Sequence, residues 1–93
     1  MNASYQEELV RLFADLEGEC VVVSFRDGSV YDLKILSAMH GREGSDCVAD
    51  VRQTLRSAGE PSTRWSEAAM NFRLEDVARV ERQNECVFRR AAA

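Results

Sequence analysis

Residues 20–36 constrain the fold of this chain more than any other segment. They read Cys-Val-Val-Val-Ser-Phe-Arg-Asp-Gly-Ser-Val-Tyr-Asp-Leu-Lys-Ile-Leu, two runs with apolar residues at alternate positions on either side of Asp27-Gly28. Alternation with a period of two predicts half-buried strands, and an Asp-Gly pair between them predicts a tight turn. The segment therefore indicates a β-rich fold, although it identifies no chemistry.

The length of the turn decides which side chains share a face of this hairpin. A two-residue loop would place Val23 opposite Asp32, so that charges would face the apolar row. A three-residue loop from Arg26 to Gly28 places Val23 opposite Tyr31 and turns the charges to the other face. Because a slip of one residue reverses every side chain, burial selects the second register. We therefore predict a type I turn with Gly28 as a left-handed bulge residue.

An amphipathic helix is predicted before the hairpin, over about residues 5–17. Ser4 and Glu7 have the spacing of a capping box, and Gly18 is placed to end the helix in a left-handed conformation. Apolar residues recur between them at helical spacing: Tyr5, Leu9, Leu12, Phe13 and Leu16. This stripe must pack on another apolar surface, and we expect it to dock on the hairpin.

Residues 47–58, which follow a polar loop at 40–46, fit two patterns. Cys47, Ala49 and Val51 alternate as in a strand, while an overlapping set of apolar residues has helical spacing. We favour the strand, and the helix remains the alternative.

Residues 66–84 also fit either strands or a helix. Met70, Phe72 and Leu74 alternate with polar residues, which predicts a strand followed by a short turn at Leu74–Val77 and a second extended segment. One continuous helix through the whole stretch is the competing interpretation.

The size and composition indicate one soluble globular domain over residues 1–93. A chain of 93 residues with 45% hydrophobic and 30% charged side chains is large enough for one modest core. Residues 89–93 are expected to fray as a tail. The sequence has neither an apolar run that would span a membrane nor the start of a secretory signal, so we expect a cytoplasmic protein with no membrane contact.

Charge is unevenly distributed along the chain. Residues 1–47 contain four basic and nine acidic side chains, whereas residues 48–93 contain eight and seven, for a net charge of −4. Acidity argues against non-specific nucleic-acid binding, which depends on neutralising phosphates, and is compatible with a basic protein partner. The basic residues that remain as a candidate stripe are Arg52, Arg73, Arg79 and Arg82.

Trp65 is the other candidate binding residue, because it lies in a predicted connection between an arginine and a serine. A buried tryptophan closes a core and an exposed one anchors an interface, and we favour the buried interpretation. An exposed Trp65 would form a binding spot together with Arg64 and Arg56. Arg73 and Arg79 are expected to lie close together across the turn at Glu75, with neighbouring carboxylates paired to them.

Residues suited to catalysis or metal binding are few. Cys20, Cys47 and Cys86 form no C-x-x-C pair, and His40 is the one histidine of the sequence. We expect the cysteines to act as small buried hydrophobic residues and His40 to be a solvated loop residue without a nucleophile beside it. The sequence therefore predicts no enzyme activity, no metal site and no cofactor.

The order of helix, Asp-Gly hairpin and a late Phe-x-Leu-Glu-Asp-Val-x-x-Val run resembles the small SH3-like barrels. Residues 23–28 are similar to the first motif of the Sm-like proteins, where Tyr31 and Ile35 also fall at apolar positions. The resemblance implies a mainly β, five-stranded barrel over about residues 20–88 with an N-terminal α-helix, and a ring or dimer assembly. The alternative fold is α+β, with two or three helices on a short antiparallel sheet.

The chain departs from the Sm-like pattern where that family binds RNA. Leu33 replaces the motif's glycine, and the base-reading Asp and Asn have no counterpart between Met39 and Asp46. The second motif is replaced by Asn71-Phe-Arg-Leu, so no RNA-binding residue can be transferred. The run from Phe72 to Val77 also resembles the Rho-binding antiterminator family, small acidic Sm-like proteins that occupy an RNA-binding site on a termination factor.

We therefore expect a non-enzymatic binding or regulatory module that acts through protein–protein contacts and self-associates as a homo-oligomer. Small barrels leave strand edges, and pairing of edges between subunits satisfies their backbone groups. The alternative is an Sm-like RNA-binding protein that uses Arg52, Arg73, Arg79 and Trp65, with binding that weakens as salt rises.

Overall fold

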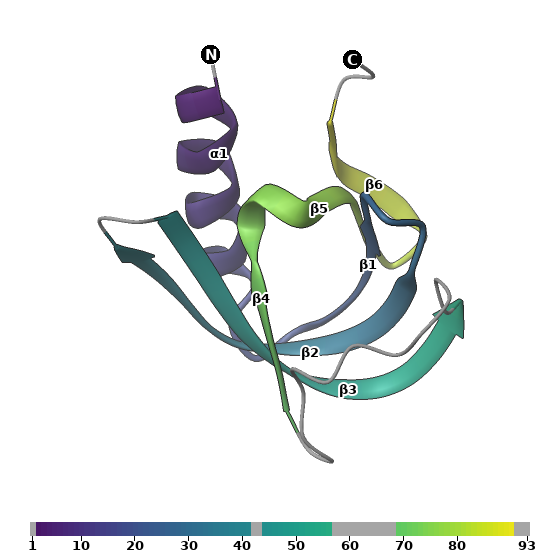
Figure 1. Cartoon of the computed structure of the whole chain (residues 1–93). Helices are drawn as coiled ribbons and strands as arrows, with labels where there is room; N and C mark the ends of the chain where they lie inside the picture. The colour runs from purple at the N-terminus through teal and green to yellow at the C-terminus, as the bar shows by residue number, and fades with distance from the viewer. Residues whose placement is uncertain (1, 42–43, 57–68, 91–93) are drawn as a thin grey trace.

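The computed structural model describes residues 2–41, 44–56 and 69–90 as one α-helix and six strands around a single core (Figure 1). The elements in the first half are α1 (Asn2–Asp15), β1 (Cys20–Phe25), β2 (Val30–Gly41) and β3 (Gly44–Arg56). Those in the second half are β4 (Met70–Arg73), the 3-10 helix η1 (Leu74–Asp76), β5 (Val77–Arg82) and β6 (Glu85–Arg89). The strands form one antiparallel sheet in the order β4-β3-β2-β1-β5-β6.

The hairpin of β1 and β2 has the predicted register. Val23 pairs with Tyr31, and the Phe25 N–H donates to the Ser29 carbonyl oxygen at 2.8 Å. Gly28 has a φ of +97°, and its N–H donates to the Phe25 carbonyl oxygen at 3.0 Å. The three-residue loop with a left-handed third residue is thus confirmed.

Helix α1 is present, but its start differs from the prediction. It begins at Asn2, so Ser4 lies within the helix instead of at its N-cap, and the predicted capping box is wrong. The helix ends at Asp15, and Gly18 has the predicted left-handed conformation, with a φ of +84°. The Gly18 N–H donates to the Ile35 carbonyl oxygen of β2 at 2.7 Å, which ties the end of the helix segment to the sheet.

The apolar stripe of α1 packs into the core, as predicted. Phe13 is fully buried and meets Phe72 of β4 edge to face, with ring centroids 5.9 Å apart. Phe72 in turn meets Phe25 of β1 at 5.0 Å, so three elements distant in sequence share one aromatic cluster. The other fully or almost fully buried apolar residues include Leu9, Leu16, Val23, Leu33, Ile35, Cys47, Leu74, Val77 and Val80.

The two ambiguous segments are strands wherever the structure describes them. Residues 47–56 belong to β3, which confirms the favoured interpretation, while residues 57 and 58 lie outside the described residues. The stretch from residue 70 to residue 82 consists of β4, η1 and β5 instead of one helix. The predicted short turn at Leu74–Val77 is η1, closed by a bond from the Val77 N–H to the Leu74 carbonyl oxygen.

The prediction of a five-stranded barrel is wrong in strand number and in closure, although the mainly β class with an N-terminal helix is confirmed. β6 adds a sixth strand outside β5, and the described strands form an open sheet with β4 and β6 at its edges. Figure 1 shows β2 and β3 strongly curved, in agreement with the register shifts in their pairing. η1 connects β4 to β5, which pairs with β1, and Phe13 of α1 packs against Phe72 of β4.

The predicted fraying does not extend to Arg89 and Arg90. Arg89 pairs with Arg79 in the β5–β6 ladder, and the Arg90 N–H donates to the Ala78 carbonyl oxygen at 2.8 Å. Residues 91–93 lie outside the described part of the chain. Within that part, α1 is too short and too polar to cross a bilayer.

Candidate binding surfaces

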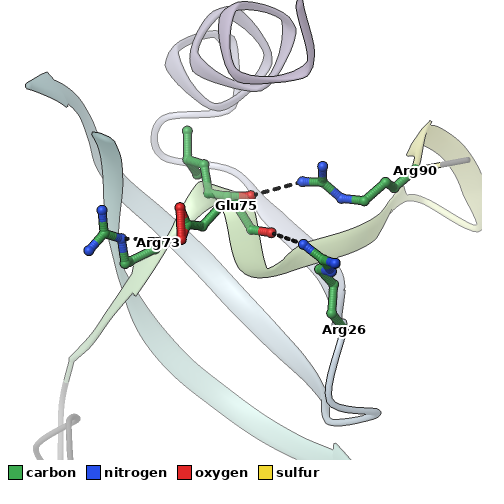
Figure 2. Close-up of polar contacts among 5 residues, drawn as sticks. Arg26, Arg73, Glu75 and Arg90 are labelled. Carbon is green, nitrogen blue, oxygen red and sulfur yellow. Dashed lines mark hydrogen bonds and ion pairs between the residues drawn. The ribbon is translucent and has the colours of Figure 1, made fainter. Parts of the chain in front are cut away.

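Three arginines from distant parts of the chain surround the 3-10 helix η1 (Figure 2). Arg26 follows β1, Arg73 ends β4 and Arg90 follows β6. Figure 2 shows Arg26 and Arg90 directed toward η1, which contains Glu75, whereas only the Nε of Arg73 lies on the Glu75 side. Arg26 and Glu75 are exposed, whereas Arg73 and Arg90 are partly buried.

Arg26 and Arg90 donate to backbone carbonyl oxygens of this turn. Arg26 Nη1 lies 3.3 Å from the Glu75 carbonyl oxygen. Arg90 Nε lies 2.9 Å from the Val77 carbonyl oxygen, and its Nη2 lies 3.3 Å from that of Leu74. These charge-assisted bonds join the end of β1, the turn after β4 and the residue after β6. The two guanidinium groups therefore have a structural role at this turn.

Arg73 is held by a different set of neighbours. Its Nε lies 3.9 Å from Glu75 Oε1, so the expected pairing with a carboxylate of the turn is confirmed. Its guanidinium lies over Gly44, where a Cβ would stand only 2.6 Å from Nη2. Gly44 also has a φ of +132°, which L side chains rarely adopt, so the backbone conformation favours glycine here. Arg73 thus packs on the hairpin of β2 and β3.

The predicted basic stripe does not assemble into one site. Arg52 is on β3 and Arg79 is on β5, with β2 and β1 between these strands. Arg79 Nη2 lies 2.7 Å from Glu81 Oε2, so its carboxylate comes from its own strand and not from the turn at Glu75. Trp65 lies outside the described residues, and its predicted role stays untested.

Arg52 contacts the thiol of a cysteine and not a carboxylate. Its Nη1 lies 2.8 Å from Cys20 Sγ on the exposed side of the sheet. The contact with Cys20, reinforced by the negative charge of Asp32, raises the pKa of Arg52 above its ordinary value. No local pattern predicts this pair, because the two residues are 32 positions apart and meet only through the β1–β2–β3 pairing.

The three cysteines differ in environment. Cys47 is buried as predicted, and burial raises the pKa of its thiol to about 12, which makes it a poor nucleophile. Cys20 and Cys86 are exposed, so the prediction that all three act as buried hydrophobic residues is wrong for these two. The described side chains contain no group of three His, Cys, Asp or Glu residues arranged to hold a metal. His40 belongs to β2 by its backbone, contrary to the predicted loop, and its side chain is outside the described set.

A hollow of about 380 Å³ lies between α1 and β6. Four of its lining residues come from α1, namely Glu7, Glu8, Arg11 and Leu12, and Val87 lines it from β6. Leu12 and Val87 are partly buried and pack against the core, whereas the three charged residues are exposed. The hollow, called the α1–β6 groove below, thus combines an apolar base with a charged rim beside one edge of the sheet.

Three large apolar side chains are exposed elsewhere on the sheet. Leu36 and Met39 are on β2, and Leu55 is near the end of β3. The ladder places Met39 next to the β2–β3 turn, whereas Leu55 lies near Val30 at the opposite end. Because they are spread along the sheet, these side chains do not define one apolar patch.

Two features suited to binding remain, the open sheet edges and the α1–β6 groove. Sequence reasoning missed the groove, although Glu8 and Leu12 are spaced one helical turn apart in the sequence. Their position opposite Val87 depends on a contact across most of the chain. Comparisons with protein-family models, curated proteins and solved structures found no significant match.

Proposed function

We propose that this chain is a small, non-enzymatic binding module that acts through protein–protein contacts and self-associates. The observation that supports this best is the open sheet, whose described strands end in β4 on one side and β6 on the other. An edge strand presents backbone donors and acceptors on its outer side, and pairing with another chain satisfies them. Such pairing is a common basis of both self-association and peptide recognition.

The environments of the reactive side chains support a binding role over catalysis. Cys47 is enclosed in the core, with its thiol pKa raised to about 12. Cys20 is held by Arg52, and Cys86 Sγ lies 3.3 Å from the carbonyl oxygen of Phe88 on its own strand. Neither of these contacts brings a general base to an exposed thiol.

RNA binding by an Sm-like module is the alternative proposal and has weaker support. Arg52 and Arg79 lie on separate strands, and each is engaged by a thiol or a carboxylate of the protein itself. Phosphate neutralisation requires basic side chains that face the nucleic acid together. Single-stranded RNA titrated at low salt tests this alternative, and tight binding that is lost on Arg79→Ala would favour it over the module proposed here.

Light scattering across a micromolar to millimolar concentration range tests self-association. A lysine on an edge strand disfavours strand pairing, so Asn71→Lys on β4 is expected to shift the protein toward monomer. Ser24→Lys is the matched control, because Ser24 is a partly exposed residue of β1 that pairs with Val30 of β2 and Arg79 of β5. A wild-type protein that stays strictly monomeric throughout this range would refute the self-association.

A further inference from the structure

The strand pairing places a row of arginines across the sheet, from β3 to β6. Arg56 of β3 pairs with Val30 of β2, and Val30 pairs with Ser24 of β1. Ser24 also pairs with Arg79 of β5, which pairs with Arg89 of β6. Residues directly opposite each other in an antiparallel ladder share a face of the sheet, so these five side chains form one row, called the arginine row below.

The arginine row lies on the face of the sheet that points away from the core. Strand residues alternate between faces, and the neighbours Val80 and Phe88, which pair with each other, are buried. Arg79 and Arg89 therefore point outward, and both are exposed, as is Arg56. Helix α1 covers the opposite face, because its apolar stripe is part of the core.

Two of these arginines face each other with too little counter-charge. Arg79 and Arg89 are directly opposite, so their Cβ atoms lie roughly 4.5–5.5 Å apart, and like charges in this position are destabilising. Arg79 Nη2 lies 2.7 Å from Glu81 Oε2. Among the described side chains, none forms an ion pair with Arg89. One anionic group within reach of both guanidinium groups would offset their repulsion.

A row of acidic residues runs beside the arginine row on the same face. Val22 is two positions before Ser24 on β1, and it pairs with Asp32 of β2 and Glu81 of β5. Two residues along a strand span about 7 Å, which is the separation of the two rows. The positive surface is therefore a narrow strip, about 19 Å long for a strand spacing of about 4.8 Å. A ligand for this strip must keep its negative charges on one line.

We infer that the arginine row binds an acidic segment of a partner protein. One carboxylate lies between Arg79 and Arg89, and a second one, farther along the segment, lies at Arg56. Guanidinium groups bind carboxylates through paired, charge-assisted hydrogen bonds, and arginine clusters are a recurring means of recognising acidic motifs. About six residues of extended chain span the strip. The inference rests on the proposed function, since it names the partner class of the binding module.

The acidic row argues against RNA as the occupant. RNA carries a phosphate at every nucleotide, so a strand that continues past the strip would place phosphates beside Asp32 or Glu81. A peptide can carry its carboxylates only where the arginines lie. Screening limits the effect of distant charges to about 8 Å at physiological salt, so for a short segment the local row outweighs the net charge of −4.

A second copy of the chain matches the arginine row less well than a separate acidic segment. Glu7 and Glu8 of α1 are exposed, but Arg11 follows one turn later on the same side of the helix and would meet the arginines of the row. Glu19 Oε1 already lies 2.8 Å from Arg82 Nη2. A segment whose only charges are carboxylates avoids both conflicts.

The test uses the full chain and fluorescein-labelled octapeptides, read by fluorescence anisotropy at low salt. The probe is Ser-Glu-Glu-Ser-Ser-Glu-Glu-Ser, and its control replaces every glutamate with glutamine. Wild-type protein is expected to bind the glutamate probe about tenfold more tightly than the control, because only the probe carries carboxylates. Binding of the probe should weaken as the salt concentration rises. Octauridylate is titrated in parallel to test RNA.

Charge reversals on the two faces of the sheet locate the site. Arg89→Glu is expected to weaken binding of the glutamate probe by about tenfold. It places opposite charges across the β5–β6 ladder, so the fold should be at least as stable, which thermal unfolding checks. Arg11→Glu makes the same change of charge on α1, over the opposite face, and is expected to stay within about twofold of wild type. Glu81→Gln removes a competing carboxylate and should strengthen binding by about threefold.

Three outcomes would overturn the arginine row as the site of an acidic partner segment. Equal loss of binding in Arg89→Glu and Arg11→Glu would show a non-specific charge effect. Octauridylate that binds more tightly than the glutamate probe, and less tightly to Arg89→Glu, would identify RNA as the occupant. Loss of self-association in Arg89→Glu would identify a second copy as the occupant.

The same measurements separate this inference from the proposed function. Absence of probe binding by a wild-type protein that self-associates would overturn the inference alone. A strictly monomeric wild-type protein that binds the probe would support the inference and overturn only the self-association. Absence of both activities would overturn the inference and the proposed function together.

Discussion

Two β-hairpins of this protein, β1–β2 and β5–β6, reverse the chain with different turns. The β1–β2 hairpin uses a three-residue loop in which Gly28 alone takes a positive φ, of +97°. The β5–β6 hairpin uses the two residues Gln83 and Asn84, with φ values of 53° and 68°, which is the pattern of a type I′ turn. Asparagine tolerates this left-handed conformation, whereas glutamine at such a position is uncommon.

The difference follows from where each hairpin lies in the sheet. β1 and β2 are central strands, and one face of their ladder is buried in the core, so their register is determined by burial. β6 is an edge strand in which Phe88 is the one buried residue and Val87 is partly buried. The central hairpin is therefore determined by packing, and the edge hairpin depends more on its turn and on Arg90. The following predictions test this contrast.

The largest expected effect compares one substitution in the two hairpins. Val23→Ala removes fully buried methyl groups from β1 and is expected to cost about 2 kcal/mol of unfolding free energy. Val87→Ala removes the same atoms from a partly buried site on β6 and is expected to cost about 0.5–1 kcal/mol. Urea denaturation measures both, and equal costs would show that the edge hairpin is as tightly packed as the centre.

The next effect concerns backbone conformation in the turns. Gly28→Ala is expected to cost about 1–2 kcal/mol, because a Cβ disfavours a left-handed residue, although no other atom lies within 4 Å of the position. Asn84→Ala is expected to cost less, since the residue there already carries a Cβ at a φ of 68°. Thermal unfolding of both variants provides the measurement, and a larger cost at Asn84 would reverse the proposed contrast.

A pH-dependent contribution is expected in the central turn. Asp27 Oδ1 accepts bonds from the Ser29 hydroxyl at 2.6 Å and the Ser29 N–H at 2.9 Å, and these bonds lower the pKa of Asp27 below 3.8. The carboxylate therefore stabilises the fold above its unfolded-state pKa, and this contribution is lost as the pH falls through the lower folded-state pKa.

Two substitutions at Asp27 isolate that contribution. Asp27→Ala removes the acceptor and is expected to cost about 1 kcal/mol at neutral pH. Asp27→Asn retains an acceptor oxygen, so it should cost less at neutral pH and differ little from wild type near pH 3. Urea unfolding at the two pH values measures the difference, and an unchanged gap between wild type and Asp27→Asn would contradict the role of the charge.

The smallest expected effect is a gain in stability at the edge. The double substitution Gln83→Asn with Asn84→Gly creates the Asn-Gly pair favoured in type I′ turns and is expected to stabilise the fold by about 0.5 kcal/mol. Thermal unfolding with Gln83→Asn alone as the control measures the share of each position. A loss of stability would indicate that the Gln83–Asn84 turn is not under conformational strain.

Local patterns were sufficient to predict the elements that have one clearly apolar face and one polar face. The alternation around Val23 and the buried stripe at Leu9, Phe13 and Leu16 predicted a hairpin register and a helix that the structure confirms. The start of α1 was misjudged because the helix begins at Asn2, two residues before the capping-box pattern at Ser4. Boundaries depend on small energy differences that tertiary contacts readily outweigh.

The candidate site was much harder to predict than the fold. The strand order separates Arg52 from Arg79. Each of the three predicted arginines also has a different partner: Cys20 for Arg52, Glu75 for Arg73 and Glu81 for Arg79. The role of Arg90 at η1 and the hollow beside Val87 both require residues more than a dozen positions apart to meet. Spacing within one segment carries no information about such meetings.

Local patterns were enough to predict a helix with one apolar stripe and strands whose alternation leaves one apolar face. The six-stranded open sheet, the arginines around η1 and the hollow that Glu8 and Leu12 line with Val87 all depend on the packing of distant segments. The reason is that periodicity reports which face of an element must be buried. Which other element covers that face depends on the packing of the whole chain.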